Sequence, residues 1–290
     1  MSPPAQSEDF AFSFDIDGVI YKSGQLCQGA KEAMTWLSDN NVPFIFLTNG
    51  GGKTEDVRAA DMAERLGIPL SPSQFIQAHT PFKNQVPSLA DKKALVLGGV
   101  GDECRFVAEH YGFKVITSAD IVTAYPSIFP FNEMYGSYFA KTARPLAVRD
   151  GENSPSLEIA AIFIFSSPRD WGLDLQIITN LLLSERGRFG TLSPLNGNPD
   201  LPNKGYLQDG QPRIFFANPD HTYATKHPFP RVCQGSFKLA LQGIWSGLTG
   251  TQLINSTHYS QLASRPNSNL NMVSKLFLKF PEKSSGRSTW

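Results

Sequence analysis

Residues 10–21 read FAFSFDIDGVIY, and the fold class follows from this stretch. Apolar, β-favouring residues run up to Phe14 and stop at Asp15-Ile16-Asp17, which is how a buried parallel strand passes into a loop. The pattern therefore places two carboxylates at the carboxyl end of a strand. Open α/β sheets bind their ligands at this edge, so we expect the functional site there.

The next segments predict the sheet to which this strand belongs. Apolar residues at helical spacing indicate a helix over 29–40, and an apolar run predicts a strand over 42–47 that ends at Thr48-Asn49-Gly50. Strand, helix and strand in this order are typical of a parallel sheet. The first unit of the chain is therefore predicted to be α/β.

From Lys93 the pattern restarts, which predicts a second α/β unit inserted into the first. The segment 187–212 is rich in Gly, Pro, Asn and Asp and is expected to be an irregular loop, while periodicity fades from Ser256 onward. The remaining predicted elements are helices over 57–66, near 80–89, and over 103–111, 173–183 and 235–248, and strands over 94–97, 114–116, 159–165 and 214–217.

Composition excludes several classes of protein. The 26 basic and 26 acidic residues cancel, and no basic block is long enough to follow a phosphate backbone, so nucleic acid is not an expected partner. Three widely spaced cysteines, at 27, 104 and 233, are expected to be reduced thiols of an intracellular protein. No apolar run is long enough to span a membrane, and the first residues lack a secretion signal, which favours the cytoplasm.

The two strand ends carry the residue types that phosphoryl transfer requires. Asp15 can attack phosphorus as a nucleophile, and Asp17 can protonate the leaving oxygen and then activate water. A Mg²⁺ ion bound by Asp15 and the backbone carbonyl of Asp17 would neutralise the phosphate charge. Thr48, Asn49 and Gly50 follow the neighbouring strand, where a hydroxyl and backbone amides can hold a phosphate oxygen.

These motifs resemble those of a known superfamily. The segments FSFDIDGVIY at 12–21 and FIFLTNGGG at 44–52 resemble motifs I and II of the haloacid dehalogenase (HAD) superfamily, in its class IIA. Three later segments resemble a eukaryotic subfamily related to the cat eye syndrome critical region protein, whose members are often described as mitochondrial. These segments are IFIFSSPRDWGLDLQIITNLLL (162–183), FFANPDHTYATKHPFPR (215–231) and CQGSFKLALQGIW (233–245).

The resemblance implies a Rossmann-like parallel-sheet core, incomplete at its C-terminal end, with an inserted α/β cap of the C2 type. It implies a phosphatase of a small phosphorylated metabolite, with Asp15 as nucleophile, Asp17 as acid and base, Mg²⁺ as cofactor, and pairing of two copies through the cap. Asp220, in a predicted Asx-type turn, could face the site from the cap side. The implied division is core over 1–88, cap over 89–222, core over 223–280 and a disordered tail over 281–290.

Near its C-terminal end, the sequence departs from the motif pattern of the family. After the cap, the family has a lysine in Gly-Lys-Pro and then an aspartate that binds the metal. The chain reads Ser264-Arg265-Pro266 where the lysine is expected, and no aspartate follows Asp220. Arg265 is the nearby cation that could replace the lysine. Loss of a fixed positive charge typically lowers the rate by about 10²–10³-fold, so we expect the activity to be reduced. A frameshift or altered splice is one hypothesis for the changed C-terminal sequence.

Three functions stay open at this point. The first is a HAD phosphatase. The second is a catalytically impaired, cap-bearing binding or regulatory protein, or a truncated gene model of such an enzyme. The third is a sugar-nucleotide transferase that uses Asp15-Ile16-Asp17 to bind Mn²⁺. The glycine-rich loop at 98–101 resembles a dinucleotide-binding loop in composition, but we expect it to be structural.

Overall fold

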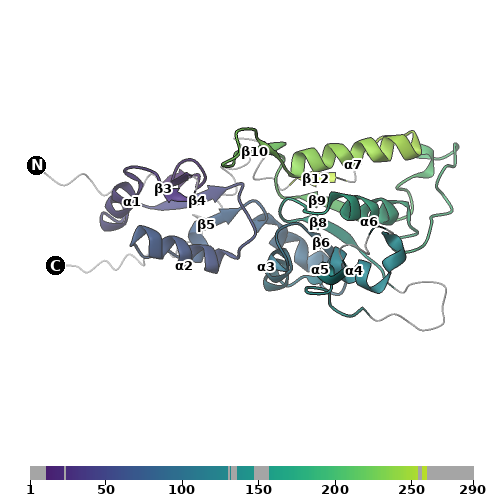
Figure 1. Ribbon diagram of the computed structural model, residues 1–290, viewed down its shortest axis with the longest axis horizontal. Helices are drawn as coiled ribbons and strands as arrows, with labels where there is room; N and C mark the ends of the chain where they lie inside the picture. Colours follow the sequence, from purple (N-terminus) through teal and green to yellow (C-terminus); the bar gives the residue numbers. More distant parts are fainter. Residues whose placement is uncertain are drawn as a thin grey trace, which may run out of the picture.

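The computed structural model describes residues 11–22, 24–129, 131, 136–146 and 157–253, together with the backbone of 257–259. Its two main sheets are parallel and belong to two α/β units that lie beside each other (Figure 1). The α/β class predicted from the sequence is thereby confirmed. The boundaries that we placed between core and cap remain predictions, and residues 281–290 lie outside the described part of the chain.

The N-terminal unit, purple and blue in Figure 1, holds a three-stranded sheet of order β1-β4-β5. A short antiparallel hairpin, β2 and β3, follows β1 directly. The elements of this unit are β1 (Phe12–Phe14), β2 (Tyr21–Lys22), β3 (Gln25–Leu26), α1 (Ala30–Asp39), β4 (Phe44–Thr48), α2 (Glu55–Leu66), the 3-10 turn η1 (Pro72–Gln74) and β5 (Phe75–Gln77).

The second unit holds a five-stranded sheet of order β12-β9-β8-β6-β7. A 3-10 stretch, η2 (Thr80–Leu89), leads into it from β5. Its strands are β6 (Lys93–Leu97), β7 (Lys114–Ile116), β8 (Ala161–Ile164), β9 (Arg213–Phe216) and β12 (Thr257–Tyr259), with the hairpin β10 (Thr222–Tyr223) and β11 (Arg231–Val232). Its helical elements are α3 (Glu103–Tyr111), α4 (Ser118–Ala124), η3 (Pro126–Ile128), α5 (Gly136–Phe139), α6 (Trp171–Leu183), η5 (Pro202–Gly205) and α7 (Gln234–Thr249).

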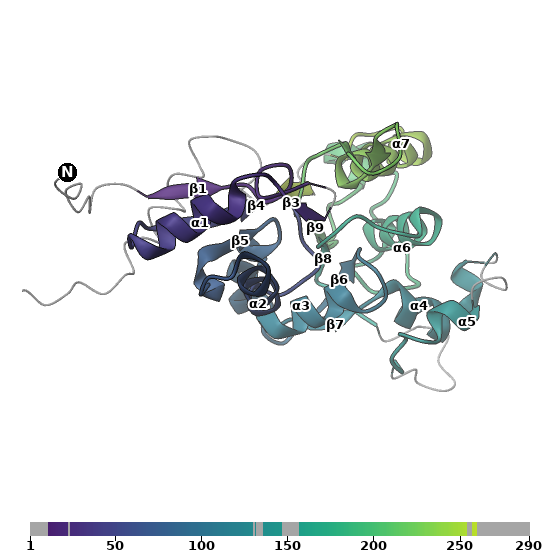
Figure 2. The ribbon, with the colours of Figure 1, turned by 60° about the vertical axis from the view of Figure 1, so that its left-hand side comes forward.

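Both faces of the five-stranded sheet are covered, as the continuous apolar composition of its strands requires. Successive residues of a strand point to opposite faces, so Leu95 and Leu97 pack with α4, α6 and α7, whereas Ala94 and Val96 pack with α3 and η2. Figure 2 shows α3 on one side of the strands and α6 and α7 on the other. Helix α7, which we expected within the C-terminal segment of the core, thus packs against this sheet through Trp245.

Three phenylalanine rings contact one another across the sheet in the core of the N-terminal unit. Phe46 is fully buried in the middle of the sheet, with ring centroids 5.6 Å from Phe44 and 4.9 Å from Phe75. Met34 of α1 and Met62 of α2 close this cluster. Burial of each such side chain stabilises the fold by about 1.5–3 kcal/mol, so this small sheet has a core of its own.

Local signals explain where the helices begin and end. The Thr54 side chain accepts a hydrogen bond from the Val57 amide at the start of α2, and Gly67 ends that helix in a left-handed conformation. The Asp170 carboxylate caps α6 by accepting from the Leu173 amide at 3.0 Å. Such signals lie within a few residues of each helix, so the sequence predicts these helices well.

Most predicted elements are confirmed to within a few residues, but several short ones were missed. The strand β5, helix α4 and the two hairpins were absent from the sequence prediction, as was β12, which lies where periodicity fades. The stretch at 80–89 is a 3-10 helix, and Pro87 inside it removes a backbone donor that an α-helix would use. All three cysteines are free. None of the helices in the described ranges has the length and apolar character needed to cross a membrane.

Candidate active site

Asp15 and Asp17 leave the end of β1 as exposed side chains. Between them Ile16 is only 3% exposed and packs in the core of the N-terminal unit, which turns both carboxylates outward. The Ile16 amide donates to Asp15 Oδ1 at 2.7 Å, and the Ile16 carbonyl accepts from the amides of Ile20 and Tyr21. This tight turn holds the two acids at the carboxyl edge of the sheet, as predicted.

The loop after β4 lies against the first motif. Thr48 is 5% exposed, and its Oγ1 accepts a hydrogen bond of 3.0 Å from the Gly50 amide. A Cβ atom placed on Gly50 would lie 3.2 Å from Asp17 Oδ2 and 3.3 Å from Thr48 Oγ1. The structure thus brings Asp17, Thr48 and Gly50 together around one small volume, because β1 and β4 are adjacent parallel strands.

A turn from the second unit closes over the same loop. Asn49 donates from Nδ2 to Asp220 Oδ2 at 3.0 Å, and Asn218 donates from Nδ2 to the Asn49 carbonyl at 3.4 Å. The Asp220 amide donates to Asn218 Oδ1 at 2.7 Å, which is the Asx turn expected from the sequence. Asp220 is therefore placed at the predicted phosphate loop, although its contact is with Asn49.

A buried polar network connects the two units below this loop. Tyr111 Oη and Thr80 Oγ1 each donate to Glu55 Oε1 at 2.7 Å, and Lys83 Nζ lies 3.1 Å from Glu55 Oε2. His79 Nδ1 lies 2.8 Å from Tyr111 Oη. Burial alone would raise the pKa of Glu55, but hydrogen bonds from Tyr111 and Thr80 lower it overall. The network therefore holds an ionised carboxylate at the junction.

His79 brings this network into contact with the loop after β4, the predicted phosphate loop. Its side chain is 0% exposed, and a Cβ atom on Gly51 would lie 2.8 Å from His79 Cδ2. Burial lowers the pKa of His79 to about 4, so the ring is neutral at pH 7. The five histidines show no ligand spacing in the sequence, so the sequence carried no signal for this contact.

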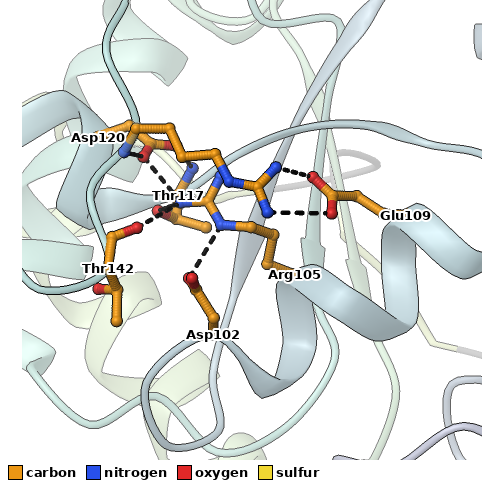
Figure 3. Close-up of polar contacts among 7 residues, drawn as sticks. Asp102, Arg105, Glu109, Thr117, Asp120 and Thr142 are labelled. Atoms are coloured by element: carbon orange, nitrogen blue, oxygen red, sulfur yellow. Dashed lines mark hydrogen bonds and ion pairs between the residues drawn. The ribbon is translucent and has the colours of Figure 1, made fainter.

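The glycine-rich loop at 98–101 packs within the second unit. A Cβ on Gly98 would lie 2.0 Å from the Ser166 carbonyl oxygen, so the loop packs directly on the chain after β8. Beside it, Arg105 is 1% exposed and binds Asp102 at 2.9 Å and Asp120 at 2.7 Å (Figure 3). This cluster ties α3 to the start of α4, which agrees with the structural role expected for the loop.

The donor set at the strand ends fits Mg²⁺. Within the described ranges no group of three or more His, Cys, Asp or Glu residues could hold a metal ion by itself. Mg²⁺, however, is usually bound through one or two carboxylates, with water and substrate phosphate completing its shell. The exposed carboxylate of Asp15, together with the backbone carbonyl of Asp17 two residues later, matches that requirement.

Comparison with known proteins identifies the family. A family model described as haloacid dehalogenase-like hydrolase matches residues 12–114. A mitochondrial hydrolase of Saccharomyces cerevisiae is 34% identical over 253 residues, which are 87% of this chain and 66% of that protein. The chain belongs to the haloacid dehalogenase-like hydrolase family. A cardiolipin synthase (CMP-forming)/mitochondrial hydrolase fusion protein of Schizosaccharomyces pombe is 36% identical over 255 residues. These are 86% of this haloacid dehalogenase-like chain and 39% of the fusion protein.

Solved structures agree on the fold of this haloacid dehalogenase-like chain. A 4-nitrophenylphosphatase from Thermotoga maritima superposes with a TM-score of 0.53 at 16% identity, covering 93% of this chain and 74% of that one. The predicted α/β fold of this family is therefore confirmed. Arg265 and the segment in which the family lysine and aspartate were sought lie outside the described residues, so their roles remain predictions.

Proposed function

We propose that this chain hydrolyses a small phosphomonoester through an aspartyl-phosphate on Asp15. The observation that carries the proposal is the meeting of Asp17 with the Thr48 hydroxyl around Gly50, at the carboxyl ends of two adjacent parallel strands. An acid and a hydroxyl are thus combined on the strand edge where open α/β folds act on ligands. Family membership supports a hydrolase.

The proposed reaction has two balanced steps. In the first, an Asp15 carboxylate oxygen forms a bond to phosphorus while the bond from phosphorus to the ester oxygen breaks, and Asp17 gives its proton to that leaving oxygen. In the second, Asp17 takes a proton from water, whose oxygen attacks phosphorus and releases phosphate from Asp15. The Thr48 hydroxyl and the amides after Asn49 hold the non-bridging oxygens throughout.

We also infer that Asp15 and Asp17 would hold Mg²⁺, which when bound neutralises charge on the phosphoryl oxygens. The identity of the ester is set by the second unit, whose Asp220 turn closes one side of the loop. From the names of the two fungal relatives we infer a mitochondrial setting for the chain. Pairing of two copies through the cap remains a prediction from the resemblance.

The test is hydrolysis of 4-nitrophenyl phosphate by the purified chain in the presence of Mg²⁺. We expect Asp15→Asn to lower activity to background and Asp17→Asn to lower kcat by about 10²–10⁴-fold, the usual contribution of general acid and base catalysis. Asp39→Asn, an exposed aspartate at the end of α1, serves as the matched control and should retain full activity.

Circular dichroism of each variant separates loss of function from loss of fold. A folded wild type without hydrolysis would refute the proposal and favour the binding or regulatory protein. Turnover by Asp15→Asn equal to that of the wild type would refute the assignment of Asp15 as the nucleophile. Reduction of the trapped acyl-phosphate with borohydride, followed by mass spectrometry, should mark Asp15 in the active protein.

A further inference from the structure

Arg58 lies on the first turns of α2 and reaches the loop after β4. Its Nη2 donates to the Gly51 carbonyl at 3.3 Å, and its Nε donates to Gln77 Oε1 at 3.2 Å. Gln77 is 0% exposed and donates from Nε2 to the Lys53 carbonyl at 2.8 Å. One guanidinium is therefore tied to two points of the same loop, directly at Gly51 and through Gln77 at Lys53.

The guanidinium also lies beside the proposed acid and base. A Cβ on Gly50 would lie 3.9 Å from Arg58 Nη2, and the same position is 3.2 Å from Asp17 Oδ2 and 3.3 Å from Thr48 Oγ1. A cation, a carboxylate and a hydroxyl thus converge on the side of Gly50 that a Cβ atom would occupy. Among the described residues, Nη1 of Arg58 makes no hydrogen bond, so this nitrogen is available to a ligand.

The charge of Arg58 is retained in this setting. Burial lowers the pKa of the guanidinium, whereas the negative charges of Asp17 and Asp61 raise it. An arginine side chain stays protonated in proteins under such opposing effects. A permanent positive charge in a half-buried position interacts with a phosphate more strongly than one in bulk water, because water screens it less.

We propose that Arg58 is the positioning cation of this site, which holds the loop at 49–53 in shape and attracts the phosphoryl group toward Asp15 and Thr48. The inference rests on the phosphatase function proposed above. It gives Arg58 the role that sequence analysis considered for Arg265. The sequence carried no signal for it, because Arg58 and Asp17 are brought together only when α2 packs on the sheet formed by β1, β4 and β5.

The test compares Arg58→Met and Arg58→Lys with the wild type by two readouts. The first is kcat/KM for 4-nitrophenyl phosphate with Mg²⁺, and the second is the dissociation constant of inorganic phosphate, measured by calorimetry. We expect Arg58→Met to lower kcat/KM on the order of 100-fold and to weaken phosphate binding about tenfold or more. Arg58→Lys keeps the charge but not both hydrogen bonds, so it should recover part of each loss.

Arg213→Met is the matched control, because this exposed arginine begins β9 at the end of the strand remote from Asp220. It should leave both readouts unchanged. Arg58→Met with wild-type kcat/KM and wild-type phosphate affinity would overturn the proposal. The proposal would also be overturned if Arg58→Lys had the same kcat/KM and phosphate affinity as Arg58→Met, because a positive charge at this position would then have no effect on the site. If the methionine variant fails to fold, the lysine variant alone tests the proposal. Wild-type kcat/KM and wild-type phosphate affinity in Arg58→Lys would then show that the hydrogen bonds of Arg58 to Gly51 and Gln77 do not contribute.

The two proposals can fail separately. A wild type that binds phosphate but does not hydrolyse the ester would refute the phosphatase function, while the phosphate affinity of Arg58→Met would still decide the role of Arg58. A wild type that hydrolyses the ester in an Asp15-dependent way, with no change in Arg58→Met, would refute only the role of Arg58. A wild type that neither binds phosphate nor hydrolyses the ester would refute both.

Discussion

Mild acid should destabilise this protein through His79. The ring is fully buried where the two units meet, and Tyr111 donates its own proton to Glu55. His79 Nδ1 must therefore be the donor toward Tyr111 at 2.8 Å, which leaves Nε2 as a bare acceptor. Nε2 is buried without a hydrogen-bond partner among the described residues. Adding a proton there would place a charge beside the loop at Gly51 with no partner to receive it.

The size of the effect follows from the two protonation states. Burial lowers the pKa of His79 from 6.5 to about 4 in the folded chain, while the charge of Glu55 opposes the shift. In the unfolded chain the imidazole titrates near its ordinary value of about 6.5. Between these values the unfolded state binds more protons, so the free energy of unfolding falls as pH falls through this window. The loss is about 2 kcal/mol between pH 7 and pH 5, and stability is retained above the unfolded pKa.

Urea unfolding followed by circular dichroism at pH 7 and pH 5 measures this loss. His79→Gln should be less stable than the wild type at pH 7, because contacts with Tyr111 are lost, but it should lose about 2 kcal/mol less on acidification. The exposed His221, replaced by Gln, is the matched control and should keep the wild-type pH dependence. Equal losses in the wild type and His79→Gln would refute the reasoning, as would a ring titration above pH 6 in the folded wild type.

Three further changes test the second unit by urea unfolding. Gly98→Ala should cost about 3 kcal/mol or more, because its Cβ meets a carbonyl oxygen at 2.0 Å and φ is +103°, whereas Gly136→Ala, with open space around it, should change stability by less than about 0.5 kcal/mol. Arg105→Met removes the partner of the buried Asp120 and of the partly buried Asp102 (Figure 3) and should cost about 3–5 kcal/mol. A loss below about 1 kcal/mol would show that the cluster does not stabilise the fold. Burial raises the pKa of Asp174 from 3.8 to about 7, so the folded state binds more protons than the unfolded state between these values, and the stability of Asp174→Asn relative to the wild type should rise as pH rises from about 4 to about 7. If Asp174→Asn showed no gain in stability, the result would contradict the burial of a charged carboxylate at this position.

Local patterns account for what could be predicted. The helix over 103–111 and the strand over 114–116 were placed at their observed bounds, since apolar periodicity and a terminal glycine lie within the segment itself. The strand β5, Phe75–Gln77, is no longer than the strand over 114–116, and it was missed because it lies in the connection between two predicted helices, 57–66 and 80–89. This strand matters for the proposed site, because β5 carries Gln77, which accepts a hydrogen bond from Arg58.

The candidate site divides in the same way. Asp15, Asp17, Thr48 and Asn49 could be proposed from the sequence because each follows an apolar strand, and parallel strands end at one edge. The contact of Asn49 with Asp220 joins residues far apart in the chain, and only a loose turn signal pointed to it. Arg265 was considered because it lies near the expected lysine in sequence, and it lies outside the described residues.

The sequence by itself determined the α/β class, the order of the main elements and the acidic and hydroxyl groups at the strand ends. These features are local, since hydrophobic period and strand-end motifs are read within a dozen residues. Only the tertiary structure decided which charges surround them. Arg58 beside Asp17, and His79 with Glu55 and Tyr111 beneath the loop, are contacts between separate elements, and their distances and burial arise when the sheets and helices pack.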